Sequence, residues 1–269
     1  MQDLGRHSVL GVNISALDYE AAVDQIASAA RELRPLAVSA LAVHGLMTGA
    51  LDKQHRFRLN QFDILAPDGQ PVRWALRWLH GVSLPDRVYG PTLMLKTCER
   101  AACDGLPIYL FGGTRELLDD LQASLLSRYP NLPIAGAMPS KFRRLRDREE
   151  RDELVKSIRD SGARITFVGL GCPRQEVWGY EFREAISMPC LAVGAAFNFH
   201  AGQLSQAPPT LQRLGLEWLY RLCAEPRRLW RRYLLLNPLY LAMLATQFCH
   251  LSRYDSSHDP APAEEILYG

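Results

Sequence analysis

The chain has little excess charge of either sign. Its 269 residues include 31 lysines and arginines against 29 aspartates and glutamates, which gives a formal net charge of +2. Proteins that bind nucleic acid over a broad surface carry a larger basic excess, so we expect no nucleic-acid partner and infer that any basic function is local. A composition of 48% hydrophobic and 22% charged residues excludes wholesale disorder, collagen-like repeats and a coiled coil. The length fits one large domain or two small ones.

Cysteine is scarce, and the six cysteines form no C-x-x-C pair and no zinc-type cluster with histidine. We therefore expect reduced thiols and a cytosolic compartment. Residues 1–8 are largely polar and lead into only a brief apolar run, so the hydrophobic region of a secretory signal is lacking. These features predict a protein that stays in the cytoplasm.

Several nucleotide and metal motifs are also absent. No G-x-x-x-x-G-K-[ST] sequence occurs, which excludes a P-loop, and no Asp-x-Asp occurs. The run Gly169-x-Gly171-x-x-Arg174 has arginine where the dinucleotide fingerprint requires glycine or alanine, and no suitable acidic residue follows about 20 positions later. His44 and His200 have no second ligand at a useful spacing. The sequence therefore predicts no cofactor and no metal.

Strand and helix patterns alternate along the first part of the chain. Asp18 stands where an N-cap would begin a helix. Pro71 follows the turn Pro67-Asp68-Gly69 and suits the first position of another helix. The expected strands are 9–14, 36–43 and 62–66, and the expected helices are 19–33, 44–51 and 72–79.

Three passages from strand to glycine turn to helix follow. This repetition predicts an α/β fold of Rossmann-like parallel-sheet layers with helices on both faces, and a ligand at the carboxyl ends of the strands. Residues 1–204 would form this core as two halves divided near residues 100–105. The passages are 106–111 followed by Gly112 and Gly113, 164–168 followed by Gly169 and Gly171, and 189–193 followed by Gly194. After the first of them, Thr114 is the expected N-cap of a helix that runs to residue 127.

The last third of the chain is basic and then uncharged. Residues 212–233 contain six arginines and two glutamates, with aromatic residues among them. Residues 233–251 contain no Asp, Glu, Lys or Arg, which matches the about 20 residues of a membrane span. Polar residues such as Asn237 and Gln247 interrupt this stretch, so helices lying on an anionic membrane surface are favoured over a span. We predict a helical membrane-associating appendage at 205–252 and a disordered tail at 253–269.

The glycines that follow the strands are candidates for a nucleotide site. Glycine allows close backbone approach, and the next helix N-terminus offers free N–H groups to a phosphate. The same glycines would equally serve a simple turn from strand to helix, so both interpretations stay open. The candidates are Gly112, Gly113, Gly169 and Gly171.

Asp68 is the candidate catalytic base, because a carboxylate between a strand and a helix could accept a proton from a substrate hydroxyl. The alternative is that Pro67-Asp68-Gly69 is simply favourable turn chemistry. Gln175 is a candidate for bonding a sugar or phosphate, and Glu176 fits as a complement to the helix dipole. Arginines suit a lipid-borne diphosphate and lipid headgroups, although a solvated helix face is the default. These arginines are Arg221, Arg227, Arg228, Arg231 and Arg232.

Six motifs are spread along the chain. They are PDGQP at 67–71, DRVYGP at 86–91, YLFGG at 109–113, VGLGCPRQE at 168–176, VGAAFNFHAG at 193–202, and GLEWLYRL at 215–222 followed by EPRR at 225–228. In this order, over about residues 9 to 240, the sequence resembles the WecG/TagA/CpsF family of bacterial glycosyltransferases, glycosyltransferase family 26.

The resemblance implies an inverting, metal-independent transfer of a sugar from a UDP-sugar to a polyprenyl-diphosphate-linked saccharide, in exopolysaccharide or other surface-polysaccharide synthesis. By resemblance, Asp68 matches the family's catalytic base, and Arg87 and Gln175 match positions implicated in catalysis or substrate binding. The arginines after Trp218 match a C-terminal appendage thought to close the site and touch the membrane. We therefore expect an enzyme attached peripherally to the inner face of the bacterial cytoplasmic membrane.

Two positions depart from the family pattern. Ala42 stands where many members have a polar residue, and Asn198 stands where they commonly have aspartate. Both fall where substrate would bind, so Asn198 joins the nucleotide-sugar candidates and we expect a hexose or N-acetylhexosamine-type donor.

A soluble nucleotide-dependent oxidoreductase and a non-catalytic membrane-surface binding module are the competing interpretations. A homo-oligomer is compatible with the sequence, which does not determine the number of subunits.

Overall fold

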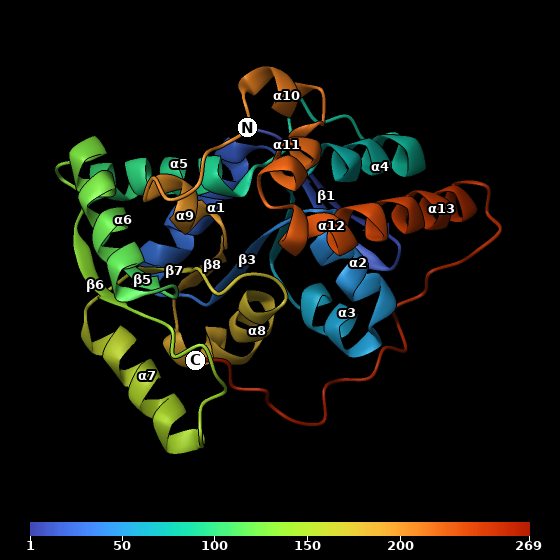
Figure 1. Ribbon diagram of the computed structural model, residues 1–269. Helices are drawn as coiled ribbons and strands as arrows, with labels where there is room; N and C mark the ends of the chain where they lie inside the picture. The colour runs from blue at the N-terminus through green and yellow to red at the C-terminus, as the bar shows by residue number, and fades with distance from the viewer.

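A computed structural model describes the backbone of residues 1–269 and every side chain except those of Pro209, Arg228 and Arg232. Six strands form one parallel sheet in the order β4-β3-β8-β7-β5-β6, which confirms the predicted α/β class (Figure 1). The sheet registers pair Leu41 with Pro67, Phe111 with Val168, and Val168 with Ala192, so these strands end at a common edge. The strands are β3 (Leu36–Leu41), β4 (Ile64–Pro67), β5 (Ile108–Phe111), β6 (Ile134–Met138), β7 (Ile165–Val168) and β8 (Pro189–Ala192).

Helices cover both faces of the sheet, as the sequence predicts. On one face α1 (Tyr19–Glu32), α5 (Gly90–Asp104) and α6 (Arg115–Arg128) pack around Phe167. On the other face Trp178 and Leu46 belong to two further apolar clusters. The helices that build these clusters are α2 (Val43–Leu51), α3 (Lys53–Asn60), α4 (Gln70–His80), α7 (Arg148–Asp160) and α8 (Arg174–Ile186).

The two predicted helix caps are confirmed. The carboxylate of Asp18 accepts a hydrogen bond from the backbone N–H of Ala21, 2.8 Å away, at the start of α1. The hydroxyl of Thr114 accepts one from the N–H of Leu117 at the start of α6. Each side chain supplies a partner to an N–H that the first helical turn leaves without one.

An N-terminal hairpin replaces the single strand expected at 9–14. Strands β1 (Asp3–Val9) and β2 (Val12–Leu17) pair antiparallel through a turn at Leu10 and Gly11. Both turn residues have positive φ, 52° and 83°, which is the geometry of a tight two-residue hairpin turn. The exposed, polar sequence of β1 hides this strand from a hydrophobic pattern.

The C-terminal third consists of short helices. None of the helices in the described part of the chain is long and apolar enough to cross a membrane. Within the uncharged stretch, α13 packs on the α/β core through Tyr240, whose hydroxyl donates to the carbonyl of Pro71 over 2.9 Å. Figure 1 shows α13 beside α4. The helices are α9 (Ala196–His200), α10 (Pro209–Arg213), α11 (Glu217–Ala224), α12 (Pro226–Leu234) and α13 (Leu236–Phe248).

Residues 253–269, expected to be disordered, have little regular structure but make definite contacts. Asp259 forms a two-point ion pair with Arg56 of α3. Further along, the carboxylate of Glu181 accepts hydrogen bonds from the backbone N–H groups of Ile266 and Leu267. The tail therefore runs from α13 past α3 and ends beside α7 and α8 (Figure 1).

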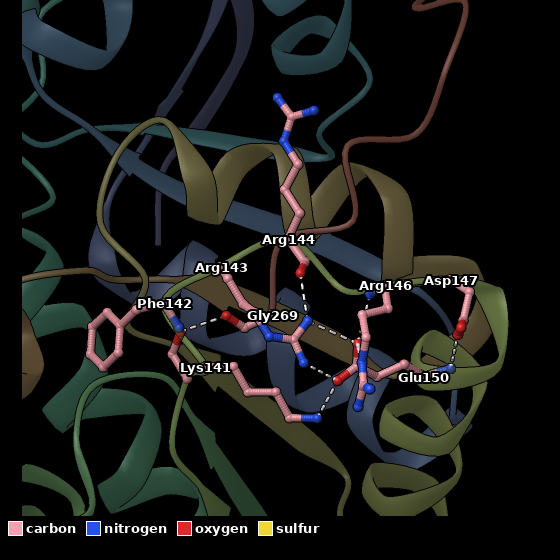
Figure 2. A network of polar contacts seen from close by, with 9 residues as sticks. Lys141, Phe142, Arg143, Arg144, Arg146, Asp147, Glu150 and Gly269 are labelled. Atoms are coloured by element: carbon pink, nitrogen blue, oxygen red, sulfur yellow. Dashed lines mark hydrogen bonds and ion pairs between the residues drawn. The ribbon is translucent and has the colours of Figure 1, made fainter.

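The end of the tail contacts a loop that carries a polar network (Figure 2). Gly269 donates its N–H to the carbonyl of Arg143 and accepts a hydrogen bond from Ser140. The carboxylate of Glu150 in turn accepts from Arg143 and from the ammonium of Lys141. These cationic donors hold the pKa of Glu150 well below its usual range.

Candidate active site

A cavity of about 970 Å³ opens at the carboxyl edge of the sheet. The residues that follow β3, β4, β5, β7 and β8 all contribute to its wall, as expected for a ligand site in an open α/β sheet. The C-terminal helices complete the wall with Glu217, Trp218, Arg221 and Arg231. The predicted candidates that line it are Asp68, Arg87, Gly113, Gly169, Gly171, Gln175, Asn198, Arg221 and Arg231.

Asp68 lies between the end of β4 and the start of α4, half-buried in the cavity wall. Its backbone N–H donates to the carbonyl of Leu41, which fixes the turn against the neighbouring strand. Burial raises the pKa of its carboxyl to about 7; the positive charge of Arg87 opposes this rise and the negative charge of Glu217 adds to it. A carboxyl with this pKa exchanges protons readily near neutral pH, which suits a general base.

Arg87 is close to Asp68 because the segment that carries it is bonded to the end of β4. The N–H of Val88 donates to the carbonyl of Pro67 over 3.0 Å. The guanidinium lies over the ring of Tyr89, 4.3 Å from the ring centre, and donates to Glu217 over 2.7 Å. Arg87 is buried. The site thus pairs a half-buried carboxyl with a fixed, buried cation.

The glycine candidates differ in what they do. A Cβ on Gly112 would lie 2.8 Å from the carbonyl carbon of Gly169, and a Cβ on Gly169 would lie 2.5 Å from a ring carbon of Phe197. Close packing explains these two glycines without a ligand, and Gly112 is not part of the cavity wall. Beside Gly171 there is open space, and its φ of +78° accounts for glycine there.

Gln175 is held by the protein at both ends of its amide. Its Oε1 accepts from the backbone N–H of Gly171 over 3.1 Å, and its Nε2 donates to Glu176 over 2.9 Å. The same oxygen of Glu176 accepts from the hydroxyl of Ser39. Burial raises the pKa of Glu176 above its ordinary value, although the hydrogen bonds from Gln175 and Ser39 oppose the rise. The arrangement fixes the loop after β7 at the edge of the cavity.

The arginine candidates divide into two groups. Arg221 and Arg231 line the cavity, and the guanidinium of Arg221 lies 5.7 Å from the ring centre of Phe199. Arg227 is exposed and does not line it. The side chains of Arg228 and Arg232 lie outside the described residues.

The sequence did not single out Glu217, which lines the cavity, or Gln212, which does not; both accept a hydrogen bond from Arg87. The available signal for Glu217 was its position as an acidic residue within a basic segment. Its partner Arg87 lies 130 positions away along the chain, so no local pattern could pair the two residues. The histidines have no metal-type surroundings: His200 is bonded to the carbonyl of Pro91 over 2.9 Å. Among the described residues, no group of three or more His, Cys, Asp or Glu side chains could hold a metal ion.

The fold and this cavity together define an α/β protein with a carboxyl, a fixed cation and glycine loops gathered at one edge of a parallel sheet. The model of the glycosyl transferase WecG/TagA/CpsF family matches residues 7–254, so the chain belongs to this family. It is therefore a glycosyltransferase of surface-polysaccharide synthesis, with a nucleotide-sugar donor and a glycan acceptor. Membership favours a transferase over the oxidoreductase and binding-module alternatives.

Proposed function

We propose that this chain transfers a hexose or N-acetylhexosamine-type sugar from a UDP-sugar to a polyprenyl-diphosphate-linked saccharide, with inversion and without a metal ion. The observation that carries the proposal is the position of Asp68: a carboxyl with a pKa of about 7 shares one cavity with Arg87 and with the glycine loops. An inverting displacement needs one base for the acceptor hydroxyl, and Asp68 has the basicity for that role.

In the proposed reaction, the acceptor hydroxyl oxygen attacks the anomeric carbon as the bond from that carbon to the UDP oxygen breaks. The hydroxyl proton passes to Asp68, and UDP leaves with the bonding electron pair. Arg221 and Arg231, which line the cavity, supply positive charge for the departing diphosphate. Arg87 keeps positive charge next to the base and favours its ionised form.

The order of the strands supports an extended donor. Asp68 follows the edge strand β4, whereas Gly169 and Gly171 follow β7, three strands further along the sheet. With neighbouring strands about 4.8 Å apart, this separation is roughly 14 Å. We infer that the nucleotide lies at the β7 and β5 loops, next to Asn198, while its sugar extends toward Asp68.

Attachment to an anionic membrane surface is the second part of the proposal. Exposed apolar side chains gather on helices next to the cavity: Trp78 on α4, Trp230 on α12, and Leu241 and Phe248 on α13 are 43 to 56% exposed. Several large, exposed apolar side chains, together with the arginines of residues 221–231, are typical of helices that lie in a membrane interface. A lipid-linked acceptor would then reach the cavity from the inner face of the cytoplasmic membrane.

The test is a transfer assay with the purified full chain. It would be incubated in EDTA with a short-chain polyprenyl-diphosphate monosaccharide and a panel of UDP- and GDP-sugars, with the lipid-linked product followed by mass spectrometry. A mass increase of one sugar with a UDP-sugar supports the proposal. Loss of product in Asp68→Asn, with UDP binding retained by calorimetry, supports the base; Asp152→Asn, an exposed change on α7, is the matched control.

Turnover by Asp68→Asn at the wild-type rate would reject Asp68 as base. Transfer that occurs only when divalent cations are restored would reject metal independence.

A further inference from the structure

Glu217 joins the C-terminal helices to the proposed catalytic groups. Its Oε2 accepts a hydrogen bond from Nη2 of Arg87 over 2.7 Å, and the two side chains are 12% and 9% exposed. Gln212 accepts from the same nitrogen over 3.0 Å and donates to the carbonyl of Ala207 over 2.8 Å. Arg87 is therefore bound by two acceptors from the segment 207–224.

These acceptors and Arg87 belong to different parts of the chain. Arg87 lies between α4 and α5 of the α/β core, whereas Gln212 lies near the end of the short helix α10 and Glu217 begins α11. If the segment moved away, the guanidinium would lose both acceptors and keep its stacking on Tyr89. The orientation of Arg87 thus depends on the segment being docked.

Glu217 also changes the charge around Asp68. The groups that act on Asp68 are Arg87 from the segment before α5, Arg221 and Glu217 from α11, and the N–H of Gly90 at the start of α5. The hydroxyls of Tyr19 and Tyr89 also lie within electrostatic reach of Asp68. Both arginines and the N–H favour the ionised carboxylate, and Glu217 opposes them. A carboxylate that is stabilised too strongly is a weak base, so Glu217 offsets part of the effect of the cations.

We propose that Glu217 is a positioning residue, which orients Arg87 and balances the charge beside Asp68 once the segment 207–224 has docked on the core. The inference rests on the proposed function, in which Asp68 is the base.

The test compares Glu217→Gln, Glu217→Ala and the surface control Glu184→Gln, whose side chain is 72% exposed. The titration of the Asp68 carboxyl is followed by carbon NMR, with the signal assigned from Asp68→Asn, and the docking of residues 207–224 by hydrogen exchange. Both measurements are independent of turnover. Turnover is then measured with the UDP-sugar and lipid-linked acceptor of the transfer assay.

Glutamine keeps a neutral acceptor for Arg87 but removes the negative charge. For Glu217→Gln we expect wild-type protection of 207–224 and an Asp68 midpoint that falls by about half to one pH unit. For Glu217→Ala we expect kcat to fall by about 100-fold while KM for the donor stays near wild type, because the nucleotide loops lie three strands away. Glu184→Gln should match the wild type in every measurement.

A wild-type Asp68 midpoint in Glu217→Gln, or a kcat for Glu217→Ala within about threefold of wild type, would overturn the inference. These results differ from a failure of the proposed function, which would appear as wild-type turnover in Asp68→Asn whatever residue stands at 217.

Discussion

The backbone of Gly169 lies directly against the α-carbon of Gly112, so that the loops after β5 and β7 touch without any side chain between them. A Cβ at position 112 would lie 2.8 Å from the carbonyl carbon of Gly169, and the φ of Gly112 is +120°. The contact joins the loops that follow two neighbouring strands, and the N–H of Gly169 also donates to the carbonyl of Phe111 over 2.8 Å. It gives a packing reason for the glycines that follow these two strands in the sequence.

Gly112→Ala should therefore destabilise the fold through both the clash and the strained backbone. We expect a loss of about 3 kcal/mol or more in the free energy of unfolding, measured by urea denaturation. The control is Gly171→Asn, since position 171 has a positive φ but open space beside it, and asparagine tolerates that conformation. Equal stability of the two variants would show that the Gly112–Gly169 contact is unimportant.

The raised pKa of Asp68 predicts the pH dependence of catalysis. A base must be unprotonated, so kcat/KM should fall as the pH decreases through about 7, with the inflection of the acid limb near that value. The measurement is the pH profile of the transfer reaction in EDTA. An acid limb with its inflection near pH 4, the ordinary range of an aspartate, would contradict the assignment.

The same shift predicts an effect on stability. The folded pKa of Asp68, about 7, lies above its ordinary value of 3.8, so between these values the folded state binds more protons than the unfolded state. The contribution of the Asp68 carboxyl to the free energy of unfolding therefore becomes less favourable as the pH rises from about 4 to 7. Asp68→Asn removes that penalty, and we expect it to raise Tm relative to wild type at pH 8 but not at pH 4. If Asp68→Asn instead lowered Tm at pH 8, ionisation of Asp68 would not destabilise the folded state, and the raised pKa would be contradicted.

Much of this architecture was predictable because it depends on local patterns. Apolar runs followed by glycine marked β5, β7 and β8, and the caps Asp18 and Thr114 marked two helix starts. Asp68 became a candidate because its turn stands between a strand and a helix, and the structure places it in the cavity wall. These signals act over a few residues, where the sequence determines the conformation directly.

What the sequence did not reveal depends on partners far along the chain. Strand β6 is only partly buried and includes Gly136, which lies against the ring of Tyr109, so its pattern is weak. The ion pair between Arg56 and Asp259 joins residues 203 positions apart. No local pattern shows such a contact, and the tail was accordingly expected to be disordered.

The ion pair between Arg56 and Asp259 should contribute strongly to holding the tail. The two side chains are 7% and 3% exposed, and removing one partner would leave a buried charge without compensation. For Asp259→Asn we expect a loss of about 3 kcal/mol in stability and faster hydrogen exchange at 255–269. The exposed Glu264→Gln is the control. Unchanged exchange in Asp259→Asn would mean that other contacts suffice to hold the tail.

The exposed apolar side chains beside the cavity predict how the chain meets a membrane. Trp78 and Phe248 line an apolar hollow of about 360 Å³ between α4 and α13. In Trp78→Ser with Phe248→Ser we expect binding to vesicles of phosphatidylglycerol and phosphatidylcholine to fall about 10-fold or more, because each aromatic ring contributes on the order of 1.5 to 3 kcal/mol when it leaves water.

Arg227→Ser should weaken binding to the same vesicles by about fivefold and leave binding to neutral vesicles unchanged, since its attraction is to the anionic headgroups. The control is Leu126→Ser on α6, an exposed apolar side chain on a helix that contacts neither α4 nor α13 strongly. Sedimentation with vesicles measures all three variants. We expect Leu126→Ser to bind vesicles like the wild type. If Trp78→Ser with Phe248→Ser also binds like the wild type, then α4 and α13 do not form the membrane surface.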